Sequence, residues 1–498
     1  MLRPFAVLAS FSALVCLSGI APAQTGGVDP TPAVSGYVTR ISSPSDFDVN
    51  GLRVLFGPKT RTLLGSTDPY APRITGGEAF FGERVDLYGR IDRKKHQIEA
   101  TEIVFCKFKP EVLSGFAVID RVLSSSTPGP LIVRADGYLI QIKPSARIDY
   151  VAPVTSLSDI RPNIWIDYHG TQSSDGLIIA DAVTFQPNDI SNREGNLLKK
   201  TDYDPSKVPD NSKQNPVRKA LIGLDPKKIP PYTDAAMQAR VDRIGARLIP
   251  DYQRNLPDDD PSKIKFRFQL IDNPKFHDAL TLPSGVILVP RQIVERLAED
   301  SQIATVLADN IATALEKQTY RMMPAYAAMS TSQVASEVGS IFVPGLGAAA
   351  GIANYAAGKS IRTDLLEQSG RVSLGLLHDA GYDLQQAPIA WWLLASKPSK
   401  KLADTTIPPR AITLYQTIGT VWRNYPPAPA PSSETKPSTS NLVRFERHAT
   451  QFNLKAENSR SSIRSAEARR STSFSLPARD CVSKRGFFRD VSSLVSCR

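Results

Sequence analysis

The side chains best suited to hold a metal ion are few, and they are spread along the chain. The five histidines are His96, His169, His277, His378 and His448. No two of them stand four residues apart, the spacing that places two zinc ligands on one face of a helix. The four cysteines, Cys16, Cys106, Cys481 and Cys497, are also too widely spaced to indicate a metal site.

The elements that would position a site lie between residues 234 and 423. Apolar periodicity predicts a helix over 234–252, a strand over 266–271, a pair of strands over 279–290, and helices over 300–323, 362–379, 389–395 and 411–422. Gly381 follows the helix over 362–379, as suits a left-handed C-cap. The pattern is that of an α+β domain in which helices predominate.

Several motifs of this region occur in a recognisable order. Asp278–Val289 reads DALTLPSGVILV, Gly375–Asp383 reads GLLHDAGYD, and Trp391–Trp392 and Ile407–Arg410 follow. In this order the region resembles the HtpX/BepA/OMA-type zinc metallopeptidases (peptidase family forty-eight). The resemblance implies a metallopeptidase-like domain over 234–424, less than half of the chain.

The same resemblance shows where the chemistry differs. It places Asp309 and Thr313 where the family has two histidine ligands, Asn310 where it has the catalytic glutamate, and Gln368 where it has a third, glutamate ligand. Asn310 has no carboxylate to accept a proton, and Thr313 and Gln368 are poor neutral ligands for zinc. We therefore expect no catalytic residue and no cofactor. The alternative is a zinc-dependent metalloendopeptidase or chaperone-protease of the envelope with an atypical metal site.

Two binding roles stay open for the cleft of such a domain. The polar residues that can converge there are His277, Asp278, Asp309, Asp364 and Glu367; the commoner role for such residues, which we favour, is to be solvated or hydrogen-bonded without a ligand. A peptide can also add to an exposed strand edge. The residues of the predicted edge strand are Val286, Ile287, Leu288 and Val289.

The first half of the chain predicts two copies of a small β module, over 30–108 and 109–187. Val34–Val38 opens the first copy and Leu113–Ala117 opens the second, each followed by short alternating segments with turn residues between them. Five or six strands in such a length suit a small closed barrel. The copies resemble the OB-like barrel modules of exported bacterial proteins.

Aromatic residues in these modules could stack on the bases of a nucleic acid, or they could pack against other side chains of the protein. They are Tyr37, Tyr88, Phe116, Trp165 and Tyr168. Nucleic-acid binding needs such rings beside a basic groove, whereas packing is the usual role of rings within strands. We expect packing, and no nucleic-acid partner.

The N-terminus predicts export. Arg3 precedes an apolar run over 5–20, and Ala21–Ala23 forms a small-residue cleavage site, so residues 1–23 have the pattern of a secretory signal peptide. The protein is then periplasmic or secreted, in an oxidising compartment where Cys481 and Cys497 can form a disulfide and Cys106 stays unpaired.

Three other segments are rich in turn or small residues. Residues 188–233 predict a Pro-rich linker with one ordered patch near 219–224, and 425–498 predict a disordered Pro/Ser/Arg-rich tail. The apolar segment 338–358 is interrupted by Pro344 and Gly345, which favours a loop or hairpin near the cleft over a membrane span. Membrane association is not favoured.

The net basic charge is weak evidence for a nucleic-acid-binding fold. The 498 residues carry a formal net charge of +11, but Pro426–Arg498 alone hold 13 Lys and Arg against 6 Asp and Glu. The basic excess therefore belongs mostly to the tail.

The expected protein is multidomain: two small all-β OB-like barrels, then an α+β, mostly helical metallopeptidase-like domain, then a disordered basic tail. The expected function is that of an exported pseudopeptidase, a non-catalytic binding or scaffold module of the cell envelope with a protein or peptide partner. A carbohydrate- or lipid-binding module carried by the barrels is a third class, without a residue signature.

Overall fold

The computed structural model describes residues 31–65, 74–106, 111–124, 130–174, 176–202, 231–272, 278–321, 356–423 and 425. All of them belong to one compact unit, Met1–Ser433. Several predictions fall outside the described residues: the signal peptide, the patch over 219–224, His277, the segment 338–355, residues 426–498 of the tail, and Cys481 with Cys497. Cys106 is half-buried and free.

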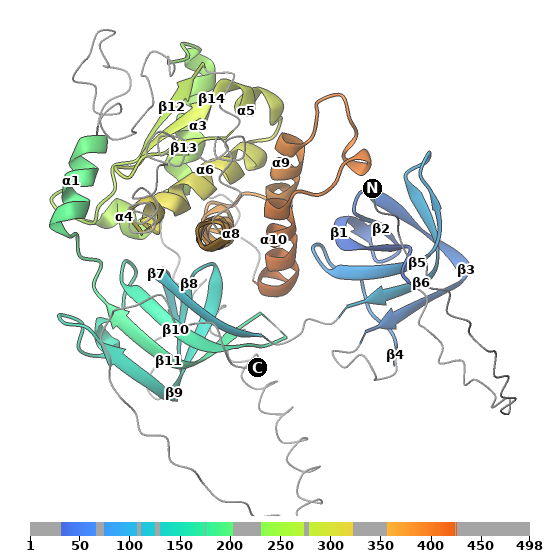
Figure 1. Cartoon of the computed structure of the whole chain (residues 1–498), viewed down its shortest axis with the longest axis horizontal. Coiled ribbons are helices and arrows are strands. Elements are labelled where there is room, and N and C mark those ends of the chain that lie inside the picture. Colours follow the sequence, from blue (N-terminus) through green and yellow to red (C-terminus); the bar gives the residue numbers. More distant parts are fainter. Residues whose placement is uncertain are drawn as a thin grey trace, which may run out of the picture. The chain divides into compact units, whose positions relative to one another are not determined.

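The first β module is a closed barrel, seen in blue in Figure 1. Its strands are β1 (Val34–Ser43), β2 (Asp46–Val49), β3 (Leu52–Leu64), β4 (Ile74–Thr75), β5 (Arg84–Asp92) and β6 (Gln97–Phe105). The ring runs β2-β1-β5-β6-β3 and closes because β3 also pairs with β2, while β4 lies beyond β3. Alternate side chains such as Val38, Phe47, Val85 and Ile103 point inward and are fully buried.

The second β module is a closed barrel with the same connectivity. Its strands are β7 (Val112–Ser124), β8 (Leu131–Ala135), β9 (Tyr138–Tyr150), β10 (Trp165–Gln172) and β11 (Ile178–Gln186). β9 pairs with β11 in parallel, as β3 does with β6, and the other neighbours are antiparallel in both barrels. The prediction of two small barrels from a duplicated module is confirmed.

Helices and a three-stranded sheet follow the barrels (Figure 1). The helices are α1 (Asn192–Thr201), α3 (Ala235–Leu248), α4 (Asp251–Asn255), α5 (Arg291–Arg296), α6 (Asp300–Leu315), α8 (Ala356–Asp379), α9 (Gln386–Ala395) and α10 (Pro409–Thr417). The strands are β12 (Arg267–Ile271), β13 (Leu280–Thr281) and β14 (Val286–Pro290). A π-helical turn over Ile418–Trp422 continues α10. Within the described ranges, no helix has both the length and the apolar character needed to cross a membrane.

Three predicted boundaries need correction. The helix expected over 300–323 ends as α6 at Leu315, and a turn in which Lys317 has a positive φ follows it. The helix expected over 234–252 is two helices, because Ile249 and Pro250 have extended backbones and a proline cannot donate the hydrogen bond that would continue α3. The linker expected over 188–233 begins with helix α1. Ser191 caps this helix by accepting a hydrogen bond from the Glu194 amide at 3.2 Å.

α6 lies in the middle of the helical core. It packs against α3, α8 and α9 and against the sheet, and all but one of its residues from Gln302 to Leu315 are buried. A helix covered on all sides places even its polar residues inside the protein, so Asp309 and Asn310 are only 3% and 4% exposed. Both must find partners within the fold.

The strand expected at an edge is central. β14 pairs in parallel with β12 on one side and antiparallel with β13 on the other. Val286, Ile287, Leu288 and Val289 are each at most 1% exposed. The prediction of a free edge at these residues is wrong, because both of the strand's hydrogen-bonding sides are already occupied.

Candidate functional site

Asp309 is held by a cationic side chain. Arg410, in the first turn of α10, forms ion pairs with Asp309 and with Asp278, the latter at 3.2 Å between Nη1 and Oδ2. The guanidinium also lies over the Trp391 ring, 3.4 Å from its centroid. Ser369 on α8 donates a hydrogen bond to the second carboxylate oxygen of Asp309 at 3.0 Å. Burial raises the pKa of Asp309, and the charge of Arg410 opposes that rise.

The side chains of Asn310 and Thr313 form hydrogen bonds with neighbouring groups of the fold. The Asn310 Oδ1 atom accepts a hydrogen bond from Thr281 of β13 at 2.6 Å, and its Nδ2 donates to the Val306 carbonyl at 2.8 Å. Thr313 donates its hydroxyl to the Asp309 carbonyl, one turn earlier in α6, at 3.0 Å. The Asn310 amide thus ties α6 to the sheet, and the Thr313 hydroxyl is bonded to its own helix.

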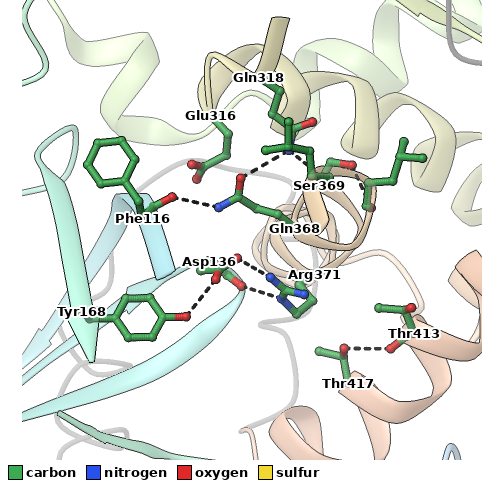
Figure 2. Close-up of polar contacts among 12 residues, drawn as sticks. Phe116, Asp136, Tyr168, Glu316, Gln318, Gln368, Ser369, Arg371, Thr413 and Thr417 are labelled. Atoms are coloured by element: carbon green, nitrogen blue, oxygen red, sulfur yellow. Dashed lines mark hydrogen bonds and ion pairs between the residues drawn. The ribbon is translucent and has the colours of Figure 1, made fainter. Parts of the chain in front are cut away.

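Gln368 reaches the second barrel. Figure 2 shows its side chain between α8 and β7, where Nε2 donates to the Phe116 carbonyl at 3.1 Å. Its Oε1 accepts a hydrogen bond from Arg321 at 2.9 Å. Both ends of the amide are therefore engaged in holding the barrel to the helices.

The residues at these positions do not fit a zinc ion. The carboxylate of Asp309 is neutralised by Arg410, whose guanidinium would be an unfavourable neighbour for a second cation. Thr313 and Gln368 offer only uncharged oxygens, which are poor ligands for zinc; the Thr313 hydroxyl donates to the Asp309 carbonyl, and Gln368 Oε1 already accepts from Arg321. In the part of the chain that the structure describes, no three His, Cys, Asp or Glu side chains come together in a metal-binding arrangement.

The structure separates the polar residues that the sequence placed in one cleft. Asp278 and Asp309 meet through Arg410. Asp364 is exposed, whereas Glu367 lines a different space, described below. Of the four members of the set that the structure describes, only Asp278 and Asp309 therefore share a site.

The second barrel is joined to the helices by buried charges. Arg134 of β8 is 2% exposed and pairs with Asp120 at 2.8 Å and with Asp379 at the end of α8. These contacts surround the guanidinium with carboxylates from both modules. Arg134 lowers the pKa of Asp379 far below its ordinary value, against the opposing effect of burial.

Glu316 and Asp136 make further contacts across this junction. Glu316, just after α6, accepts hydrogen bonds from the Val118 amide of β7 at 3.2 and 3.3 Å, and burial raises its pKa to about 8. Asp136 accepts hydrogen bonds from the Tyr168 hydroxyl at 2.8 Å and from Arg371 of α8 at 2.7 Å (Figure 2).

The turn that carries Asp136 fits closely against α8. Gly137 has a φ of +72°, and a Cβ there would lie 2.4 Å from the Arg371 backbone. Only glycine meets both demands without strain. The close approach of the β8–β9 turn to α8 therefore depends on the Asp136-Gly137 dipeptide.

The barrel aromatics pack within the protein. The Phe116 and Trp165 rings are stacked with centroids 4.5 Å apart, and Arg321 lies over both rings. Tyr168 is 2% exposed, and Tyr37 stacks on Tyr415 of α10. These contacts agree with the packing role expected from the sequence.

A cavity of about 990 Å³ lies where the two barrels meet α8 and α10. Its walls include Tyr37, Glu83 and Cys106 from the first barrel, Asp136 and Tyr138 from the second, and Glu367 and Arg371 from α8. Burial, with the nearby Asp86 carboxylate, raises the pKa of the Cys106 thiol to about 11, so this group stays a thiol at neutral pH. Cys106 is therefore not activated as a nucleophile in this cavity.

Sequence reasoning missed the basic residues that organise these sites. Arg410 ends the Ile407–Arg410 motif, but its partner Asp309 lies 101 residues earlier, and so distant a pairing leaves no local pattern. Arg134 did leave a signal: it stands in the apolar run Leu131–Ala135, where an arginine must have a buried partner. The chain matches no protein-family model, and no curated protein matches it.

Proposed function

We propose that this protein is an exported, non-catalytic binding or scaffold protein of the cell envelope, built on a metallopeptidase-like α+β domain with two OB-like barrels. The observation that carries the proposal is the set of hydrogen bonds formed by the Gln368 side chain. At the position that matches a zinc ligand in the resembling family, this side chain bonds the Phe116 carbonyl of the second barrel and Arg321.

The other matching positions support the same conclusion. Asp309 is neutralised by Arg410, and Asn310 ties α6 to β13. An amide cannot take a proton from water near neutral pH, so Asn310 cannot replace a catalytic carboxylate. Groups that would perform hydrolysis in a peptidase thus stabilise a platform that holds the barrels.

Binding is the activity that such a platform leaves open. The junctions between the barrels and the helices border the open cavity of about 990 Å³, at the upper end of the size of small-ligand pockets. A partner held there would contact three modules at once. Export and an envelope location are part of this proposal and rest on the N-terminal sequence pattern.

A peptidase assay tests the proposal. The full chain is incubated with casein and zinc, beside a chelator-treated sample, an Asn310→Ala variant and an Asp364→Asn variant, which alters an exposed residue of α8. We expect the same absence of cleavage from all four. Cleavage that is lost with chelator and in Asn310→Ala, but kept in Asp364→Asn, would show a working peptidase and overturn the proposal.

A further inference from the structure

The turns at one end of the first barrel lie against the loop between α9 and α10. His96, in the β5–β6 turn, contacts Asp404 of this loop, with 3.5 Å between Nδ1 and Oδ1. The β2–β3 turn also fits closely, because a Cβ on Gly51 would lie 3.1 Å from the Ala403 Cα. In Figure 1 the loop extends from the helices toward the first barrel. Two segments that are distant in the sequence therefore share one surface.

Both segments carry basic side chains. We call the following six residues the basic patch: Arg93, Lys94 and Lys95 of the β5–β6 turn, and Lys397, Lys400 and Lys401 of the α9–α10 loop. All six are exposed. Only two acidic residues, Asp92 and Asp404, stand in the same two segments, over 92–96 and 397–404. Residues 1–425 as a whole have only four more basic than acidic residues, which is the excess of this surface alone.

Most of the basic patch has no counter-charge. Within the described ranges, Lys95 is the one member that forms an ion pair, with Asp92 at 3.8 Å. Exposed arginines elsewhere can have closer partners, as Arg61 has in Glu102 at 2.5 Å. Like charges gathered on one surface repel each other, and a polyanionic partner would offset this cost. The patch is therefore complementary in charge to an anionic surface.

The make-up of the basic patch indicates what kind of anion it fits. Five of its six residues are lysines, which act as compact point charges, whereas recognition of a single phosphate or carboxylate favours the arginine fork. Neither segment contains Phe, Tyr or Trp, the rings that stack on nucleic-acid bases. None of the six residues lines the cavity of about 990 Å³. Diffuse positive charge on two exposed loops suits a broad anionic surface better than a polymer held in a groove.

We propose that the basic patch docks the protein on an anionic lipid bilayer. Each lysine or arginine near such a surface strengthens attachment several-fold, so six together give firm binding. Contact of this kind is peripheral and needs no membrane-spanning segment. It places the first barrel and the α9–α10 loop toward the lipid. The inference goes beyond the proposed function and shares with it only the envelope location.

Sedimentation with lipid vesicles tests the inference. The full chain is mixed with vesicles of phosphatidylglycerol and phosphatidylcholine in equal amounts, and separately with vesicles of phosphatidylcholine alone. We expect binding to the anionic vesicles only, and weaker binding as salt is added. The triple variant Lys397→Gln, Lys400→Gln, Lys401→Gln should weaken binding at least about tenfold.

A second triple variant tests whether the two segments act as one surface. Arg93→Gln, Lys94→Gln, Lys95→Gln removes the same charge from the barrel side and should weaken binding to a similar degree, at least about tenfold. Because all six side chains are exposed, both variants should keep the thermal unfolding midpoint of the natural chain. An unchanged affinity in either variant would overturn the inference.

The matched control removes three exposed basic residues that lie outside the patch. In Arg161→Gln, Lys199→Gln, Lys265→Gln the net charge falls by the same amount, and the affinity should change less than about threefold. Equal weakening in this control would show that net charge alone drives binding, to which the basic residues of Pro426–Arg498 also contribute. That result, or no binding to anionic vesicles, would overturn the inference.

Heparin and duplex DNA serve as polymer probes with the same variants. Patch-dependent binding of either polymer by a chain that does not bind vesicles would assign the basic patch to a polymer and overturn the bilayer as its partner. The casein assay is independent of these results. A chain that neither binds vesicles nor cleaves casein loses only this inference, and the non-catalytic role stands.

Discussion

The two barrels share one topology but are joined to the helices in different ways. The second barrel is held by ionisable groups deep in its junction, Arg134 and Glu316, which are 2% and 1% exposed. The first barrel is held mainly by shape: a Cβ on Gly82 would lie 2.2 Å from the Tyr415 carbonyl, and one on Gly419 would lie 2.5 Å from the Gly82 carbonyl. Its ion pair, Arg423–Glu83, keeps a guanidinium that is one-third exposed.

The difference shows how two copies of one module can be attached to the same helices by different kinds of interaction. Burying an ion pair costs desolvation energy, but removing only one of its two partners costs more, because the other charge is left buried without compensation. The buried ion pairs therefore fix one arrangement of the second barrel. Close backbone contact and packed rings, including Phe81 and Tyr415 with centroids 5.4 Å apart, hold the first barrel, and its ion pair Arg423–Glu83 is more exposed than those of Arg134. The second junction should therefore respond to charge and pH, and the first to side-chain volume.

The largest effect is expected from Arg134→Met. This change leaves Asp120 and Asp379 buried without their guanidinium, and should lower the free energy of unfolding by about 3–5 kcal/mol. Urea denaturation measures it. Arg147→Met, which breaks the exposed ion pair with Asp149 on the same barrel, should cost far less; equal losses in the two variants would contradict a charge-locked junction.

The pH dependence of stability should come next in size. Burial raises the pKa of Glu316 from 4.5 to about 8, so the folded chain holds a proton that the unfolded chain has lost between these values. The contribution of Glu316 is therefore fully present below about pH 4.5 and is lost as the pH rises through about 8, by about 5 kcal/mol at most.

Glu316→Gln should remove this part of the pH dependence. Urea denaturation at about pH 5 and about pH 8.5 would show a shallower fall in stability for the variant than for the natural chain. Asp364→Asn should leave the fall unchanged. A variant with the same slope as the natural chain would show that Glu316 does not make the junction pH-sensitive.

Gly82→Ala tests the first junction by volume. Gly82 has a φ of +81° and no room for a Cβ beside Tyr415, so we expect a loss of about 1–3 kcal/mol. Gly76→Ala is the control, because Gly76 also has positive φ but open space around it. If thermal denaturation gave the same loss for both, backbone strain alone would explain the effect, and the close contact would not matter.

The smallest effect is expected from Gln416→Leu. Gln416 is exposed and donates to the Tyr37 hydroxyl at 2.7 Å. A solvent-exposed hydrogen bond contributes little, so the free energy of unfolding should fall by less than about 1 kcal/mol. A loss as large as that of Gly82→Ala in the same denaturation experiment would mean that side-chain hydrogen bonds also hold the first barrel.

The barrels could be predicted because their signals are local. Alternation marks each strand, and pairs such as Asp136-Gly137 mark the turns between them. α1 also had a local signal, Ser191 three residues before Glu194, which is a helix-start pattern within a segment otherwise typical of a linker.

The candidate site was harder to predict because its pairings are distant. The run Val286–Pro290 has no polar alternation, which is typical of a strand covered on both sides, but only its pairing with β12 shows that it is central. The bonds from Arg410 to Asp309 and from Gln368 to Phe116 join elements far apart in the chain. No spacing rule describes such contacts.

The zinc content of the purified chain tests the central claim most directly. After dialysis against trace zinc, mass spectrometry should find less than about 0.1 zinc per chain, because Asp309 is paired with Arg410 and Gln368 is bonded to the barrel. A content near one zinc per chain would contradict the non-catalytic role and make an atypical metallopeptidase the leading account.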